Sequence, residues 1–249
     1  MSDYYRTEGF VFKKEDRMDA DRIFSVFTKD FGRLEISGKA IRKITSKLRS
    51  GAEIFSFSDI EFIQGRNKKT LTDAVAREKF KNIYQSPEKL HIAYAISDIL
   101  DNFISGQEED QVIFNFLGQV FSILNNFEFS TFNLQLFYYY FFWNFIAVMG
   151  YALEVSQCAG CQEALHPDRL YFSNKEGGIL CKNCAAHEGG SKKVEPNAVK
   201  ILRIIFKKDW EMLSKIKVEK HIQKSLREIS ANYYQFLKSN LHYEKIRNN

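Results

Sequence analysis

Four cysteines arranged as two Cys-x2-Cys pairs constrain the fold of this chain more than any other sequence feature. Cys158 and Cys161 form the first pair and Cys181 and Cys184 the second, with 19 residues between the pairs and no other cysteine in the chain. This spacing is typical of a structural zinc site, in which four thiolates complete a tetrahedral ion and leave no position for a catalytic water. The alternatives are a redox dithiol pair, whose thioredoxin-like βαβ context is missing, and a degenerate site that has lost its metal. The sequence therefore predicts one structural zinc ion.

The first 80 residues show the alternation and the turns of short β-strands. β-Branched and aromatic segments predict five strands, at residues 8–12, 22–28, 32–37, 54–64 and 70–76. In the fourth strand the apolar positions shift from 55 and 57 to 60 and 62, which predicts a bulge and a curved sheet. Five strands with a bend predict an OB-type barrel, a fold that commonly binds oligonucleotides. An SH3-like barrel fits the pattern almost as well.

From Ser86 the apolar period changes to that of helices. Helices are predicted after Ser86, from about 109 to 126, over the aromatic segment 132–153, after Pro196, and near the C-terminus. The aromatic segment is long enough to cross a bilayer, but its amides would be costly in hydrocarbon, so we predict a buried core helix and no membrane partner. The N-terminus lacks the pattern of a secretory signal, which predicts a cytoplasmic protein.

Together these segments predict an α+β fold, in which an N-terminal five-stranded OB-type β-barrel is followed by an α-helical domain with an inserted four-cysteine zinc-binding module. The expected domains are a nucleic-acid-binding barrel at 1–80, the first part of the helical domain at 81–154, the zinc-binding module at 155–190, and C-terminal helices at 191–249. The C-terminal helices are expected to pack on the helical domain.

Charge is unevenly distributed along the chain. Residues 1–80 hold 17 basic and 13 acidic side chains, residues 81–184 hold 5 and 11, and residues 185–249 hold 14 and 7. Basic ends suggest a partner with a phosphate backbone. The candidate DNA contacts are the basic residues at or near the segment that joins the third and fourth strands: Arg33, Lys39, Arg42, Lys43, Lys47 and Arg49. A solvated basic loop is the alternative, and the basic run 66–69 is expected to extend the same patch.

The sequence has no recognisable catalytic set. It lacks the Gly-x4-Gly-Lys-Ser/Thr phosphate loop, the Gly-x-Ser-x-Gly elbow and the His-Glu-x2-His helix. The acidic residues Asp16, Asp19 and Asp21 are better explained as a solvated turn than as a magnesium site. A non-enzymatic protein is therefore favoured. A zinc-ribbon RNA-binding or transcription-associated protein fits the same features, and a nucleic-acid-modifying enzyme ranks third.

A family resemblance runs through both ends of the chain. It is carried by Tyr5–Lys14, Ala20–Ile23, Phe27–Leu34, the basic segment ending in Ser46–Leu48, and the two cysteine pairs with Phe172-Ser173 and Gly177-Gly178 between them. In this order the segments resemble the RecO family of bacterial DNA repair proteins. The chain departs from that family at Ala40, where the basic loop commonly carries glycine, and at Gln162 and Ala185, where glycine often follows a zinc knuckle.

The resemblance implies a non-enzymatic recombination mediator that acts in recombinational DNA repair, with a zinc cofactor in a structural role. Such a protein binds single- and double-stranded DNA and anneals complementary strands. With a RecR-like partner protein, it helps to load the recombinase RecA onto DNA coated by single-stranded DNA-binding protein, whose C-terminal tail is expected to bind the helical domain. It further implies a cytoplasmic, nucleoid-associated protein.

Overall fold

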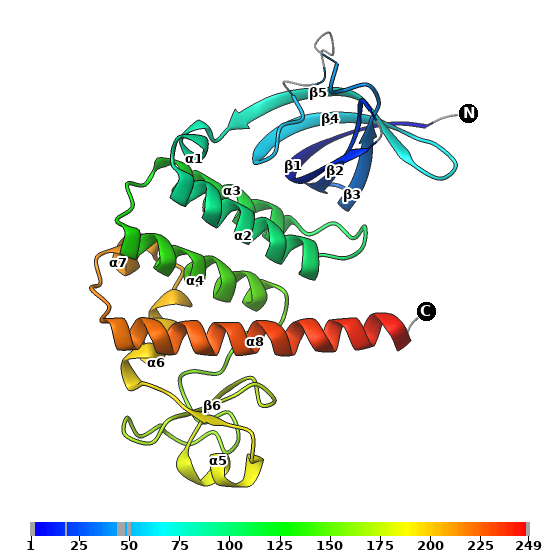
Figure 1. Cartoon of the computed structure of the whole chain (residues 1–249). Helices are drawn as coiled ribbons and strands as arrows, with labels where there is room; N and C mark the ends of the chain where they lie inside the picture. The colour runs from blue at the N-terminus through cyan, green and yellow to red at the C-terminus, as the bar shows by residue number, and fades with distance from the viewer. Residues whose placement is uncertain (1–2, 18, 44–47, 49–50, 248–249) are drawn as a thin grey trace. The chain divides into compact units, whose positions relative to one another are not determined.

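The computed structural model describes residues 3–17, 19–43, 48 and 51–247. Contacts divide the chain into two compact units, Met1–Phe129 and Ser130–Asn249, which we call the N-terminal unit and the C-terminal unit. The N-terminal unit holds the barrel strands and the first helices, and the C-terminal unit holds the remaining elements (Figure 1). The division after Phe129 lies within the region predicted as 81–154, and the predicted domain bounds stay a prediction.

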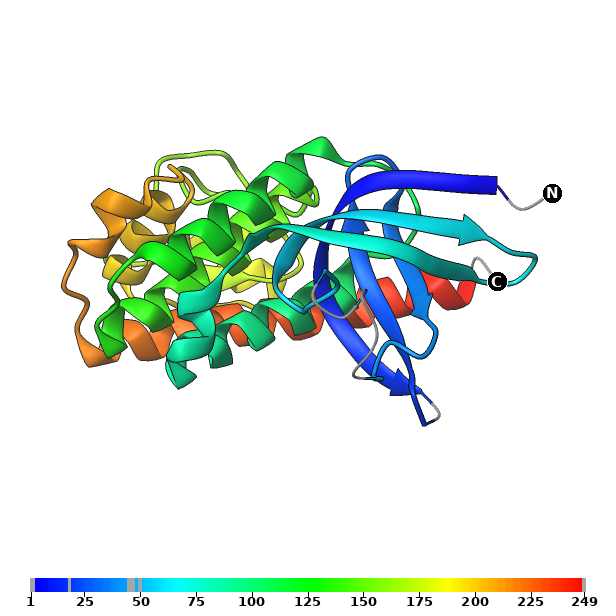
Figure 2. The ribbon, with the colours of Figure 1, turned by 90° about the horizontal axis from the view of Figure 1, so that it is seen from above.

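The N-terminal unit is built on a closed five-stranded barrel, which confirms the predicted fold class (Figure 2). Its strands are β1 (Asp3–Arg17), β2 (Asp21–Thr28), β3 (Gly32–Gly38), β4 (Ser56–Gln64) and β5 (Lys69–Lys79). They follow the order β1-β2-β3-β5-β4, and β4 pairs back to β1. All neighbours are antiparallel except β3 and β5, whose described pairing is limited to Ile36–Lys69 and Ser37–Thr70. The first half of β3 therefore has no described pairing with β5, and we call this part of the β3–β5 edge the seam of the barrel.

The pairing of β4 with β5 contains register shifts after Phe57 and after Glu61, as the predicted bulge requires, but burial along β4 itself keeps one alternation. Ser56, Ser58, Ile60 and Phe62 are all buried on one face of β4. The extra residues at these shifts belong to the partner strand β5. The serines take interior positions because their hydroxyls find backbone acceptors, as when Ser58 donates to the carbonyl of residue 51 over 2.7 Å.

Short helices cover an aromatic outer face of the barrel within the N-terminal unit. They are α1 (Lys81–Gln85), α2 (Pro87–Phe103) and α3 (Gln111–Asn126). As predicted, Ser86 is the N-cap of α2, and its hydroxyl accepts the Lys89 N–H. Phe10 of β1 lies 4.9 Å from Phe57 and 4.4 Å from Phe121 of α3, measured between ring centroids. This second apolar layer fixes the first helices against the barrel.

The C-terminal unit packs helices around one aromatic helix and carries the cysteine segment. Its helices are α4 (Thr131–Val148), α5 (Lys182–Glu188), α6 (Pro196–Ile205), α7 (Trp210–Ser214) and α8 (Lys220–Arg247). A small sheet has the order β7-β6-β8, formed by β6 (Tyr171–Ser173), β7 (Gly178–Leu180) and β8 (Lys192–Lys193). Trp143 of α4 is fully buried, and its indole N–H donates to Ser230 of α8. The predicted helices over 132–153 and after Pro196 are present, but α4 ends at Val148, before the predicted bound, and α6 ends at Ile205, before Trp210.

The uncharged helix α4 is a core helix. Its fully buried Asn144 donates to the carbonyls of Tyr140 and Ile205, so the amide that would be costly in hydrocarbon joins α4 to the end of α6. Among the helices of the described residues, none is both long enough and apolar enough to cross a membrane.

Candidate nucleic-acid interface and metal centre

Exposed basic side chains follow β3, on a segment that is anchored to the barrel. Lys39, Arg42 and Lys43 are exposed, whereas Ile41 between them is 2% exposed and belongs to the barrel core. The Ala40 N–H donates to Asp21 Oδ1 over 2.8 Å, which ties this segment to the start of β2. Because the backbone is held from inside, the three cations face outward as a group. The predicted contacts Lys47 and Arg49 lie outside the described residues.

The acidic turn predicted to be solvated supports this basic segment. Asp16 accepts a hydrogen bond from Arg22, which is the main reason that the pKa of Asp16 is lowered, and its carboxylate lies 3.7 Å from Arg42. Asp21 is used by the backbone of Ala40. These carboxylates therefore have partners within the barrel.

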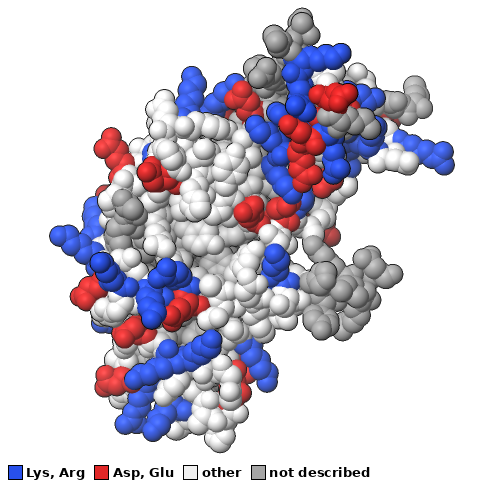
Figure 3. All heavy atoms as spheres, viewed as in Figure 1, with Lys and Arg blue, Asp and Glu red and all other residues white. Residues whose placement is uncertain are grey.

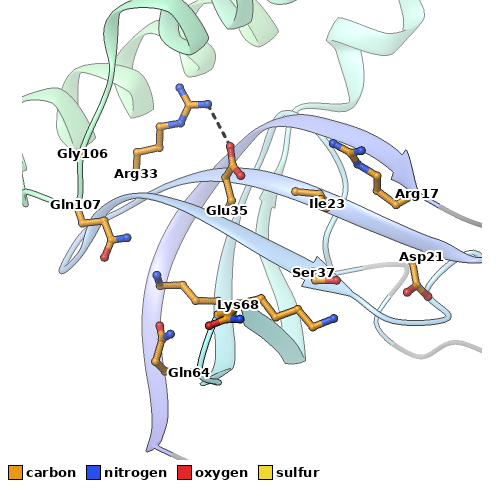
Figure 4. A pocket seen from close by; sticks show the side chains of 12 residues that line it. Arg17, Asp21, Ile23, Arg33, Glu35, Ser37, Gln64, Lys68, Gly106 and Gln107 are labelled. Carbon is orange, nitrogen blue, oxygen red and sulfur yellow. Dashed lines mark ion pairs between the residues drawn. The ribbon is translucent and has the colours of Figure 1, made fainter. Parts of the chain in front are cut away.

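A groove of about 630 Å³ opens on the barrel beside the seam between β3 and β5. Its walls come from the β1–β2 turn, β3, the β4–β5 turn and the segment after α2, and Figure 4 shows the Arg33 and Glu35 side chains together, with Arg17 and Asp21 elsewhere along the wall. Lys68 and Lys69 of the predicted basic run line the groove. Sequence reasoning missed Arg17 and Gln64, although the loops after the first and fourth strands of an OB-type barrel are recognised binding loops.

Arg33 lines this groove, but its guanidinium is engaged by the protein. It donates to Asp101 Oδ1 over 2.6 Å and to the backbone carbonyls of Asp101 and Ile104 at the end of α2. The guanidinium also lies 5.5 Å from the ring centroid of Phe12. Only 17% of the side chain is exposed. Arg33 therefore binds the C-terminal end of α2, and its predicted role as a phosphate contact stays a prediction.

Asp101 joins two barrel strands to α2. Its carboxylate accepts Lys13 of β1 over 2.7 Å as well as Arg33 of β3. Burial would raise the pKa of Asp101, but the hydrogen bonds from Lys13 and Arg33 outweigh it and lower the pKa below its ordinary value. We call Lys13, Arg33 and Asp101 the α2 latch.

The aromatic residues considered for base stacking are used in packing. Phe24, Phe27 and Phe55 are at most 2% exposed, and Phe57 contacts Phe10. No base can reach a ring that is buried in this way. Of the exposed tyrosines described in the N-terminal unit, Tyr84 and Tyr94 lie on helices, and Tyr4 lies near the start of β1.

All four cysteine sulfurs converge in the C-terminal unit. Cys158 is fully buried, Cys181 is the N-cap of α5 and Cys184 lies in its first turn. The four sulfurs lie within 4.8 Å of one another, and those of Cys161 and Cys181 are 3.9 Å apart. Four sulfurs around one zinc ion at about 2.3 Å would be separated by about 3.8 Å. The cluster therefore fits a tetrahedral metal ion.

Backbone groups around the cluster favour bound thiolates. Burial would raise the pKa of Cys158, but the backbone N–H groups of Cys161, Cys181 and Gly160 outweigh it and lower the pKa to about 6. The neighbouring sulfurs of Cys181, Cys161 and Cys158 raise the pKa of Cys184 to about 12. A divalent cation at the centre would stabilise four neighbouring thiolates, which otherwise disfavour one another's ionisation.

Three residues stand where the family often has glycine, and their backbone conformations differ. Gln162 has φ +64°, so the expected left-handed residue after the first knuckle is present without glycine. Ala185 lies inside α5 and carries no such strain. Ala40 has φ +51°, so it adopts the backbone conformation that glycine would take more easily.

Comparison with known proteins covers nearly the whole chain. The model for the N-terminal part of recombination protein O matches residues 1–80, and the model for its C-terminal part matches residues 84–239. The chain is 29% identical over 222 residues to the DNA repair protein RecO of Dehalococcoides mccartyi, which covers 89% of this chain and 86% of that protein. It is 26% identical over 234 residues to the DNA repair protein RecO of Alkaliphilus metalliredigens, which covers 92% and 91%.

Proposed function

The chain belongs to the RecO family of DNA repair and recombination proteins, and from this premise we propose that it acts as a non-enzymatic recombination mediator. In this role it binds single- and double-stranded DNA and anneals complementary strands. It also helps to load a recombinase onto DNA coated by single-stranded DNA-binding protein. Its contribution is to hold and align strands, so it needs charged surfaces rather than a reactive group.

The barrel supplies the surface that carries this proposal. Exposed Lys39, Arg42 and Lys43 project from a segment whose backbone is fixed by Ile41 and Asp21. Because the backbone is already anchored, only the side chains of these cations lose conformational freedom when they meet a phosphate backbone, and binding releases the counterions of the DNA. The nearby groove adds further basic residues for the strand to follow, Arg17, Lys68 and Lys69.

Zinc is the proposed metal, with a structural role. The four cysteine sulfurs would hold it, and a complete set of thiolates leaves no position for a water or a substrate. The apolar cluster around these cysteines is small, with Leu180 and Ala185 as its buried aliphatic members. Such a segment needs a metal to stay folded, which supports a structural role.

We propose two protein partners from the resemblance to the family. One is a RecR-like protein, and the other is the C-terminal tail of single-stranded DNA-binding protein, which would enter the helical region. Among the basic residues available there, Lys89 donates to the Asn125 carbonyl and lies 5.6 Å from the Phe129 ring centroid. Burial lowers the pKa of Lys89. Anisotropy with a labelled tail peptide tests this contact, and absence of binding at low salt would remove it.

Annealing of complementary oligonucleotides by the purified protein is the direct test of the proposed function. We expect faster annealing with the protein than without it, and a loss of the effect at high salt because phosphate contacts carry the binding. The absence of DNA binding at low salt would refute the proposal. Preference for RNA in a competition assay would instead favour an RNA-binding protein.

A triple substitution of Lys39, Arg42 and Lys43 to Ala tests the barrel surface. Each phosphate contact contributes about 0.9 to the salt slope on duplex DNA and about 0.7 on single strands, so the slope should fall by about 2 to 3. The matched control replaces exposed lysines of the C-terminal unit, Lys215, Lys217 and Lys220. Equal losses in both variants would contradict the barrel as the main DNA surface.

A further inference from the structure

The excess positive charge of the chain lies in the C-terminal unit. The N-terminal unit holds 19 basic and 20 acidic residues, a net charge of −1, although it contains the barrel. The C-terminal unit holds 17 basic and 11 acidic residues, a net charge of +6. A polyanion would therefore be attracted to the C-terminal unit as well as to the basic segment of the barrel.

The two units also differ in how their cations are paired. In the N-terminal unit, carboxylates lie within 4.0 Å of Arg6, Lys13, Arg17, Arg22, Lys29, Arg33, Arg42, Arg77 and Lys79. Among the described side chains of the C-terminal unit, the lysines and arginines paired in this way are Lys215 and Lys224. In Figure 3, Lys and Arg side chains lie in the lower part of the view, where Figure 1 labels β6 and α5, with Asp and Glu side chains among them, and a further group of Lys and Arg lies over the barrel. Most of the described cations of the C-terminal unit therefore have no carboxylate within 4.0 Å.

A groove within the C-terminal unit collects part of this charge. It runs between β8 and α8 as two joined hollows of about 410 Å³ and 590 Å³, which share Lys193, Ser225 and Glu228. The first hollow is lined by Lys192 and Lys193, both exposed on an edge strand, and Ile229 and Phe172 give it an apolar side. Cations beside an apolar wall fit a nucleotide, which has a phosphate and a flat base.

Carboxylates restrict where a phosphate can lie. Asp168 and Glu195 line the second hollow, whereas Glu228 is the acid of the first and lies 3.9 Å from Lys224. The favourable place for an anion is therefore the end of the groove that holds Lys192 and Lys193.

A buried amide also lines this end of the groove. The Asn174 Oδ1 is buried without a hydrogen-bond partner among the described residues, so it lies out of reach of a ligand in the groove. The two exposed lysines therefore carry the binding of an anion at this end.

We propose that this groove is a second nucleic-acid site, which holds a single DNA strand through phosphates on Lys192 and Lys193. The proposal rests on the proposed function in DNA binding, and it extends the annealing role. With one site on the barrel and another in the C-terminal unit, one chain holds two complementary strands at the same time. Annealing then becomes an encounter between strands held on one protein.

Binding stoichiometry with short oligonucleotides tests this proposal. We expect two single-stranded thymidine oligomers of about ten nucleotides to bind each full-length chain at low salt. The Lys192→Ala, Lys193→Ala double variant should bind one, and its salt slope on single strands should fall by about 1.4. The matched control is Lys207→Ala, Lys208→Ala, which removes an adjacent pair of exposed lysines outside the groove and should still bind two.

The outcomes separate this inference from the proposed function. One oligomer per wild-type chain, or equal losses in the groove variant and the lysine control, would overturn the second site and leave DNA repair by the barrel intact. No binding to the wild-type chain would refute both. Zinc content and tryptophan emission show that each variant is folded.

Discussion

At the scale of single residues, the backbone of Ala40 stores strain in the basic segment. Its φ of +51° places an L-residue with a Cβ in the left-handed region. We predict that Ala40→Gly raises the free energy of unfolding by about 0.5 to 1 kcal/mol, because release of this strain exceeds the entropy that glycine adds to the unfolded chain. Urea denaturation measures the change.

The neighbouring residue provides the control for this prediction. Lys39 is not among the described residues with positive φ, so Lys39→Gly should lower the free energy of unfolding by up to about 1 kcal/mol. If both variants shift stability in the same direction, strain at Ala40 is not the cause.

The α2 latch gives a second prediction at this scale. Arg33→Ala should lower the free energy of unfolding by about 2 kcal/mol, because it leaves the partly buried Asp101 carboxylate and the last carbonyls of α2 without a donor. A double-mutant cycle with Asp101→Ala should show a coupling of about 1 kcal/mol. Coupling near zero would mean that the two residues stabilise the fold independently.

DNA binding by the same variant separates the two roles considered for Arg33. A phosphate contact would contribute to the salt slope, whereas a latch residue leaves the slope unchanged. We expect Arg33→Ala to keep the wild-type slope under conditions in which the variant is folded. A slope lowered by about 0.7 on single strands would restore Arg33 to the phosphate contacts.

The latch also predicts how stability depends on pH. The folded pKa of Asp101 is lowered from its ordinary value of 3.8. The ionised Asp101 carboxylate therefore makes its full contribution to the free energy of unfolding above pH 3.8. This contribution is lost as the pH falls through the lower folded pKa, because protonation then breaks the ion pairs with Lys13 and Arg33. Acid denaturation followed in the wild type and in Asp101→Asn should show a smaller dependence in the variant below about pH 4.

At the scale of elements, the zinc-binding segment should fold or unfold as one piece. Metal analysis should give about one zinc per chain, and Cys181→Ser should lose it, because three thiolates no longer complete the tetrahedron. Residues 155–186 should then lose hydrogen-exchange protection first, since structural zinc contributes on the order of 10 kcal/mol to small modules of this kind. Unchanged protection in the metal-free protein would contradict a structural role.

Exposed histidines provide the control for the metal site. His166 and His187 lie near the cysteines but are exposed, and four sulfurs already complete the cluster. His166→Ala and His187→Ala should each keep one zinc per chain. Loss of zinc in either variant would replace the four-cysteine site with one that includes histidine.

At the scale of the whole molecule, the two units should report separately on unfolding. Both tryptophans of the chain, Trp143 and Trp210, lie in the C-terminal unit. The Trp143 ring lies 6.4 Å from Phe172 of β6, so its emission is sensitive to the zinc-binding segment. Zinc removal should lower the unfolding midpoint measured by tryptophan emission. Arg33→Ala should leave that midpoint unchanged and lower the transition of the barrel, measured by far-ultraviolet circular dichroism. If zinc removal and Arg33→Ala each shift both signals to one common midpoint, the two units unfold together in a single cooperative transition.

The sequence by itself determined the local elements and the metal cluster. Period-two alternation and period-3.6 spacing predict the strands and helices because each reflects burial of one face, and Ser86 and Pro87 place the start of α2 through capping chemistry. The cysteine spacing predicted the converging sulfurs, because two short knuckles can meet around one ion with little constraint from the rest of the chain.

Tertiary structure alone decided which charged residues are available to a ligand. Arg33 is a basic residue at a strand end in the sequence, but folding brings Asp101, 68 positions away, against its guanidinium. Local patterns carry no information about such a partner, because it comes from a different element. The same reason explains why the groove between β8 and α8 joins Lys192 to Asn174 and Ile229 without any motif in the sequence. Charge composition is a property of the chain, whereas exposure and pairing of charge depend on which elements the fold brings together.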